Sequence, residues 1–492
     1  MRGSKAKKEK KAEAERRAAE EARMEARMAA FGPQFQEIHR NGLLDWLGAY
    51  DLSVPMMKSS TVQTAGLHLA VAAAPTSSQG LLAGEDAMTG WPVIHDEITG
   101  YELGTVSSPN VACIGDVGAG KSSFGKTWGV LRHLTLGRRV VVVDKKMQGA
   151  DAGADEHEGE YAKVARALGI EPIRFSREGR IRINPLDPAI TGGGGEAASQ
   201  TELLKAILGE IMGRDLTPRE SKALRVARQS AIAQAKAEDR LATIVDVVDQ
   251  LLAPDEDVVA AQRGLSSRED YIAWGLDIGL ALEECIEGDL MGLIDGPTSE
   301  AITLQAGLTV FDISALPDDG PAVPVVMAII NTWLRNVLVQ QKQIVPTLFV
   351  VEEGWHLVNG SFAKISQQNT KKSRGLSHAT MTMYQHLSDV PADSPAVATI
   401  KEAGTVLLFR QAREDDAHHC QELFGLPPEA VDLLMRMPTG CALLLIGTRP
   451  AIMLRAMRSE IETELANTDG ALLSRAQIEL AAPAAEKEVV AA

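Results

Sequence analysis

Short runs of apolar residues, each about the length of one strand, alternate along the sequence with stretches of helical periodicity. Uninterrupted runs such as the four valines at 140–143 are typical of parallel strands that helices cover on both faces. We therefore expect an α/β fold with a doubly wound, mostly parallel sheet. The predicted strands are 110–114, 138–144, 172–175, 308–312, 346–351, 378–384, 404–410 and 442–447, with helices between them at 123–135, 161–169 and 323–341.

Residues 201–285 depart from this alternation, because nearly every window there fits a helix. The economical interpretation is an all-helical subdomain, at 191–300, inserted into the sheet domain. The other expected parts are a charged helical arm at 1–30, a small N-terminal approach domain at 31–105 that contains a hairpin, the core at 106–190 and 301–465, and a flexible Ala-rich tail at 466–492.

The net charge of −16 is unevenly distributed. Residues 1–28 hold ten Lys and Arg against six Glu, so the rest of the chain is strongly acidic. An acidic body repels bare nucleic acid, since clustered basic residues supply most non-specific affinity for DNA. Contact with DNA is therefore not indicated by the net charge, and the basic arm is its one candidate site. The composition of the arm, however, favours a solvated helix with charge pairs four residues apart over a docking role.

No run of 18 or more uncharged apolar residues is present in the sequence. The most apolar stretch, 321–339, contains Asn331 and Arg335, so we expect a buried helix there. The N-terminus lacks the apolar segment of a signal peptide, and we expect a cytoplasmic protein. The four cysteines, Cys113, Cys285, Cys420 and Cys441, form no C-x-x-C pair, which argues against a disulfide framework or a zinc site.

The strongest chemical signal is the segment 115–122, GDVGAGKS, which satisfies the pattern G-x-x-x-x-G-K-[ST] between a predicted strand and a predicted helix. In this context the loop N–H groups and the helix N-terminus surround a phosphate, Lys121 reaches the outer phosphates, and Ser122 ligates Mg²⁺. We therefore expect ATP and Mg²⁺ as cofactors. The expected binding residues are Gly115, Asp116, Val117, Gly118, Ala119, Gly120, Lys121, Ser122 and Ser123.

Two carboxylates, Glu352 and Glu353, follow the predicted strand 346–351. Ligands of open α/β sheets bind outside the carboxyl ends of the strands, and both acids fall there. We expect Glu352 to be the metal-side acid and Glu353 to polarise the attacking water. The alternative is a solvated acidic turn.

A basic cluster at 371–375 precedes the predicted strand that ends beside Gln385. Attack on a γ-phosphoryl group needs positive charge where negative charge develops, and an arginine from a neighbouring subunit commonly supplies it. Arg374 is the candidate finger and Gln385 the candidate γ-phosphate sensor. A solvated basic loop and a strand-end turn remain open as alternatives.

Two other groups of polar residues are weaker candidates for the site. His356, His386 and the pair at 418–419 do not fall at metal-ligand spacing with acids or thiols, so we expect surface or packing roles. Asp144, at the end of the valine strand, either lines the site or caps the next turn.

Several segments together resemble one family: 110–123, 141–144 with the GEY block at 159–169, the INPLD block at 182–187, 348–355, 374–385, and 404–410 with 423–426. They are similar to the HerA/FtsK-superfamily ATPases of conjugation and type IV secretion, specifically the VirB/TraC-type energising component. The resemblance covers about residues 80 to 460, and its GEY and INPLD blocks are the more discriminating ones. It implies a RecA-like core with an inserted helical domain, and it places the metal, water, finger and sensor roles on Glu352, Glu353, Arg374 and Gln385.

The resemblance also implies homo-hexamers that act with inner-membrane secretion-channel proteins, peripherally at the inner face of the membrane, where ATP hydrolysis drives pilus assembly or substrate translocation. Two alternatives stay open: a DNA-pumping ATPase of the coupling-protein or HerA kind, and a nucleotide-gated assembly subunit with low turnover.

Two features depart from the family pattern. Glu352 stands where the family usually has aspartate, and restoring aspartate there is expected to hold or raise turnover. Only 114 residues precede Gly115, fewer than the usual N-terminal domain, so a separate chain is the expected source of that domain.

Overall fold

The computed structural model of the chain describes residues 76–148, 158–177, 179–191, 196–260, 267–354, 376–388, 390 and 394–467. The chain divides into two compact units, Met1–Ala73 and Ala74–Ala492, and every described residue belongs to the second. The predicted basic arm, Arg374 with its cluster, and the Ala-rich tail from residue 468 lie outside the described residues.

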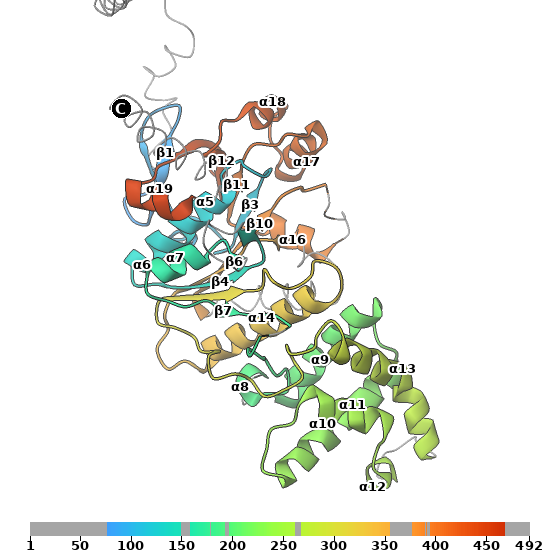
Figure 1. Ribbon diagram of the computed structural model, residues 1–492. Helices are drawn as coiled ribbons and strands as arrows, with labels where there is room; N and C mark the ends of the chain where they lie inside the picture. The colour runs from blue at the N-terminus through green and yellow to red at the C-terminus, as the bar shows by residue number, and fades with distance from the viewer. Residues whose placement is uncertain are drawn as a thin grey trace, which may run out of the picture. The chain divides into compact units, whose positions relative to one another are not determined.

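Eleven strands of the described chain form one mixed sheet in the order β2-β1-β13-β12-β11-β3-β10-β9-β4-β8-β7 (Figure 1). The seven strands from β11 to β7 pair in parallel, and the four at the other edge pair antiparallel. The predicted doubly wound, mostly parallel sheet is therefore confirmed. The strands are β1 (Leu82–Asp86), β2 (Pro92–Ile94), β3 (Val111–Ile114), β4 (Arg139–Asp144), β7 (Ile173–Arg174), β8 (Leu308–Asp312), β9 (Thr347–Val351), β10 (His378–Tyr384), β11 (Thr405–Leu408), β12 (Cys441–Ile446) and β13 (Ile452–Ala456).

The four consecutive valines of β4 point alternately to the two faces of the sheet, and both faces are covered. Val141 and Val143 pack into a core cluster shared with α14 (Ala322–Gln340), whereas Val140 and Val142 pack into a second cluster shared with Trp128. Successive strand residues point to opposite faces, so a strand that is covered on both sides needs apolar residues at every position. Figure 1 shows α14 on one face of the sheet and α5 (Lys121–Phe124), α6 (His133–Thr135) and α7 (Ala162–Ala167) on the other.

Among the helices that the structure describes, α14 alone is long and apolar enough to cross a membrane. It packs against α8 (Pro188–Thr191) and α9 (Glu196–Met212), and 78% of its most apolar 18-residue window is buried. The helix is therefore part of the core, as the sequence predicts.

The inserted helical subdomain lies between β7 and β8, as predicted. It contains α9, α10 (Pro218–Ala237), α11 (Ile244–Leu252), α12 (Glu256–Ala260) and α13 (Arg268–Glu287). Local sequence sets the start of α10, where Thr217 and Glu220 form a capping box and Pro218 occupies the first turn.

One predicted boundary needs correction. The sequence assigned 31–105 to a separate approach domain, but its described part, from Thr76, joins the core sheet. β1 and β2 form the predicted hairpin, and β1 pairs antiparallel with β13, where Arg455 forms an ion pair with Glu85. Because β13 lies more than 360 residues further along the chain, local pattern could not reveal the pairing.

The remaining described elements are α4 (Glu97–Glu102), the two-stranded pair β5 (Met147–Gln148) and β6 (Glu158–Gly159), the π-helix η1 (Gly125–Arg132), α16 (Pro395–Lys401), α17 (Glu414–Phe424), α18 (Glu429–Arg436) and α19 (Glu460–Ala466).

Candidate functional site

The glycine-rich segment joins the end of β3 to the start of α5. Gly118 and Gly120 have left-handed backbone angles, φ 75° and 105°, which residues with a side chain rarely adopt. At Gly115 a Cβ would lie 2.6 Å from the Cβ of Phe409, so the loop also needs glycine for close packing. The predicted order of strand, loop and helix is confirmed, and the N–H groups that begin α5 face the loop.

Lys121 is almost completely buried, with 8% of its surface exposed. Its Nζ donates to the carbonyl oxygens of Gly115 and Asp116, the latter at 2.8 Å. Burial lowers the pKa of the ammonium, and the charge of Glu352 opposes that shift. The side chain is therefore held inside the loop, and its positive charge lies within the segment that would surround a phosphate.

Glu352 follows β9 and meets the phosphate loop directly. Its Oε2 accepts a hydrogen bond from the Ser122 hydroxyl at 3.0 Å, and its Oε1 accepts one from the Tyr161 hydroxyl. The structure thus brings together the two residues predicted to ligate the metal. A hydroxyl and a carboxylate oxygen are hard donors of the kind that Mg²⁺ prefers, so the pair fits that ion.

The electrostatic surroundings of Glu352 are mixed. The carboxyl is buried, 5% of the residue being exposed, and burial raises its pKa. The charge of Glu160 raises the pKa further, whereas Lys126 and the hydrogen bond from Tyr161 lower it. A bound cation would favour the ionised form in the same way as Lys126 does.

Glu353 and Gln385 lie at the ends of neighbouring parallel strands, β9 and β10. The Gln385 amide donates to Oε1 of Glu353 at 3.1 Å and to Oε2 at 3.4 Å. The structure brings these two predicted residues together, and their water-activating and sensing roles stay predictions. The third predicted catalytic residue, Arg374, lies outside the described part of the chain.

A layer of ion pairs and hydrogen bonds supports Glu352 from the GEY block. Glu160 forms ion pairs of 2.7 Å with both Lys126 and Lys146. The N–H of Tyr161 donates to Asp144 at 2.7 Å, and burial raises the pKa of Asp144 well above its usual range. Asp144 therefore accepts a hydrogen bond from a residue 17 positions further on, and the nearby charge of Glu352 also raises its pKa, so it lies beside the site and does not only cap the turn after its strand. Sequence analysis missed Tyr161 as a site residue, although the GEY block was the signal that could have pointed to it.

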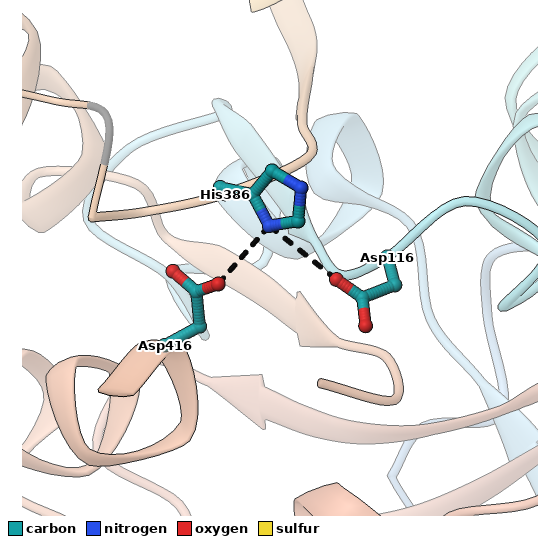
Figure 2. A group of neighbouring side chains, drawn as sticks. All are labelled: Asp116, His386 and Asp416. Carbon is teal, nitrogen blue, oxygen red and sulfur yellow. Dashed lines mark hydrogen bonds and ion pairs between the residues drawn. The ribbon is translucent and has the colours of Figure 1, made fainter. Parts of the chain in front are cut away.

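His386 links the phosphate loop to α17, as Figure 2 shows. Its Nδ1 lies 3.4 Å from Oδ1 of Asp116 and 3.0 Å from Oδ2 of Asp416. One ligand atom from each residue lies within 4.8 Å of the others, which is close enough to share a cation, but Nδ1 of the imidazole already forms a hydrogen bond with Asp416. The expected surface or packing role of His386 is therefore wrong. Sequence spacing could not reveal the contact with Asp116, because the two residues are 270 positions apart.

The four cysteines form no disulfide in the described structure, and all but the half-buried Cys285 are buried. Cys113, Cys420 and Cys441 belong to the hydrophobic core, and Cys285 packs against it.

A family model described as an AAA-like domain matches residues 97–444, more than half of the chain. No curated protein gives a significant match. Among solved structures, VirB4 of Thermoanaerobacter pseudethanolicus is 22% identical with a TM-score of 0.65, over 80% of this chain and 100% of that one. The plasmid coupling protein TrwB, solved with the ATP analogue ADPNP and with ADP and Mg²⁺, is 13% identical in each case, with a TM-score of 0.52 over 79% of this chain and 91% of that one.

At these identities the structural likeness concerns the fold, while the family model covers the phosphate loop, Glu352, Glu353 and Gln385. The chain therefore belongs to the AAA-like domain family, and it shares with VirB4 and TrwB a RecA-like P-loop core that carries an inserted helical subdomain.

Proposed function

We propose that this protein is an ATP-hydrolysing motor that energises type IV secretion or conjugative transfer, through pilus assembly or substrate translocation. The observation that carries the proposal is the contact between Ser122 of the phosphate loop and Glu352 at the end of β9. It joins the phosphate-binding and metal-binding halves of one site, beside the Glu353–Gln385 pair.

Each residue of the site has a distinct task in this proposal. The loop N–H groups and Lys121 bind the triphosphate, while Ser122 and Glu352 hold Mg²⁺. The chemistry that Mg²⁺ supplies there is neutralisation of the charge on the phosphate oxygens. Glu353 accepts a proton from the attacking water, and the Gln385 amide orients the Glu353 carboxylate. Arg374 of a neighbouring subunit would stabilise the charge that develops on the γ-phosphoryl group.

The assembly is part of the same proposal. A finger supplied by a neighbour requires a ring, and we propose a homo-hexamer at the inner face of the cell membrane, in contact with secretion-channel proteins and with a separate chain that provides an N-terminal domain. Support comes from the fold shared with VirB4, whose entire length the chain matches.

A second candidate is a DNA-pumping ATPase, which the fold shared with the coupling protein TrwB favours. The net charge of −16 makes extensive contact with DNA unfavourable, because the protein and the phosphate backbone repel each other. A third candidate is a nucleotide-gated subunit with low turnover.

Hydrolysis of ATP by the purified full chain, measured in Mg²⁺ with and without DNA, separates these candidates. Turnover that does not depend on DNA supports the secretion motor. Strong stimulation by DNA would favour the pump, and tight ATP binding with little turnover would favour the gated subunit. A chain that binds no ATP would overturn the proposal.

A further inference from the structure

Glu352 has an anchor besides the phosphate loop. Ser122 holds one carboxylate oxygen, and the hydroxyl of Tyr161, the residue before α7, holds the second. A glutamate side chain has three rotatable torsions, so one hydrogen bond leaves the plane of its carboxylate free to turn. We propose that Tyr161 is a positioning residue, which fixes the carboxylate of Glu352 in the orientation that holds the metal ion of the nucleotide. This role rests on the proposed function.

Tyr161 is itself held rigidly. Its side chain is completely buried, its N–H donates to Asp144, and the ammonium of Lys126 lies 5.3 Å from the centre of its ring. Asp144 ends β4, which pairs in parallel with β9, the strand that precedes Glu352. The tyrosine is therefore anchored on the strand next to the carboxylate that it contacts, which leaves its hydroxyl little freedom to move away.

Gly125 shows how closely the helix after the phosphate loop approaches the contact. This residue lies one helical turn after Ser122, and a Cβ on it would clash with Cε of Met383 and stand 3.0 Å from the Tyr161 hydroxyl oxygen. Both separations are tighter than an ordinary van der Waals contact, so any side chain at position 125 would press on Met383 as well as on the hydroxyl. The helix that follows the phosphate loop thus leaves room at the point where Tyr161 reaches Glu352.

A purely structural role for Tyr161 is the competing explanation, because its ring also fills the core cluster around Trp128. Tyr161→Phe separates the two, since it keeps the ring and removes the hydroxyl. Tyr271→Phe is a matched control. Tyr271 is 1% exposed, and its hydroxyl donates to the carbonyl of Ala223 at 3.0 Å within the helical insertion.

The test uses the full chain and reads metal binding directly. Mn²⁺ binding in the presence of a non-hydrolysable ATP analogue is followed by electron paramagnetic resonance, and analogue binding is also measured in EDTA. Removing a partner that orients a metal-binding side chain typically costs 10- to 100-fold in metal affinity. We expect Tyr161→Phe to weaken Mn²⁺ binding by about that factor and to leave the binding of the ATP analogue in EDTA unchanged. Tyr271→Phe should change neither, although it removes a comparable buried hydrogen bond.

Wild-type Mn²⁺ affinity in a folded Tyr161→Phe variant would overturn the inference. If that variant does not fold, Gly125→Ala combined with Met383→Ala provides the second test, because the second change removes the side chain that the new Cβ would strike first and the tyrosine is kept. Weaker Mn²⁺ binding by this double variant than by Met383→Ala alone supports the inference, and equal binding overturns it. A wild-type chain that binds neither the analogue nor Mn²⁺ would refute the proposed function itself, a result distinct from the failure of Tyr161 alone.

Discussion

The amide nitrogen of Gln385 lies within hydrogen-bonding distance of both carboxylate oxygens of Glu353, at 3.1 Å and 3.4 Å. The two residues follow the ends of neighbouring parallel strands, β9 and β10, which brings them to the same edge of the sheet. A carboxylate that accepts from a fixed amide keeps one orientation, which a general base needs in order to meet its water. Any change in the position of the Gln385 amide would therefore change the orientation of the Glu353 carboxylate.

The first prediction concerns Glu353→Gln. Glutamine keeps the size of the side chain but cannot accept the proton of the attacking water, so we expect turnover to fall about 10²- to 10⁴-fold while ATP still binds. Retention of labelled ATP on the purified protein measures this directly. Glu402→Gln, a change at an exposed acid beyond α16, serves as the control. Rapid release of product by Glu353→Gln would show that another residue activates the water.

The second prediction concerns the length of residue 352. The family resemblance favours aspartate there, but Glu352 uses its two carboxylate oxygens for contacts with two different residues, Ser122 and Tyr161. Aspartate is one methylene shorter and cannot keep both contacts. From the structure we therefore expect Glu352→Asp to raise the Mg²⁺ concentration needed for half-maximal hydrolysis, by about tenfold for one lost charge-assisted hydrogen bond.

Glu352→Ala removes the acid altogether and should have a much larger effect on the Mg²⁺ titration than the aspartate variant. A harmless Glu352→Ala would place this residue outside the metal site. Turnover of Glu352→Asp at or above the wild-type rate would favour the family resemblance over the contacts in the structure.

A third prediction concerns Arg374. If it acts on the nucleotide of a neighbouring subunit, Arg374→Ala should lower turnover by a factor on the order of 10³ with little effect on ATP binding. Mixing provides the sharper measurement. Rings that contain both Arg374→Ala and Lys121→Ala subunits should recover activity, because an intact loop of the first can face an intact arginine of the second. No recovery in verified mixed rings, or full activity in a dilute monomer, would exclude an arginine that acts between subunits.

A fourth prediction concerns stability and pH. His378, at the start of β10, is 5% exposed, and burial lowers its pKa from the ordinary 6.5 to about 4. Between these values the unfolded chain binds a proton that the folded chain does not. The buried neutral form of His378 therefore costs the folded protein no stability above pH 6.5. As the pH falls from 6.5 towards 4, the free energy of unfolding decreases, because the unfolded chain takes up the proton.

Urea unfolding at pH 7.5 and pH 5 measures this decrease. Replacement of the histidine with leucine should reduce the loss of stability between the two pH values by roughly 2 kcal/mol. The control is His418→Leu, at an exposed position of α17, which should leave that loss unchanged. An equal effect of the two variants would contradict the assignment to His378.

Those parts of the fold that depend on local pattern were predictable from the sequence. The valine run of β4 and the capping signals of α10 mark their elements by side-chain type alone. The phosphate loop and the two acids after β9 were predictable for the same reason, since the chemistry of each lies within a few consecutive residues.

Contacts between distant segments were not predictable. The pairing of β1 with β13, the bridge from Asp116 to His386, and the hydrogen bond from Tyr161 to Glu352 each join residues at least 191 positions apart. Only the order of strands in the sheet brings such residues together, and no spacing in the sequence encodes that order. The supporting residues Tyr161 and His386 were therefore missed, although the phosphate loop and the two acids after β9 could be predicted.

The central claim is that the phosphate loop and the acids after β9 form a working ATPase, and Mg²⁺-dependent hydrolysis by wild type and Lys121→Ala tests it most directly. Lys121 contacts carbonyl oxygens of its own loop, so its loss should leave the fold intact, as judged by thermal unfolding. Lys163→Ala, which removes an ammonium that donates to the carbonyl of Glu464, is the matched control. We predict hydrolysis by wild type and Lys163→Ala and none by a folded Lys121→Ala. Undiminished turnover in Lys121→Ala would contradict the account.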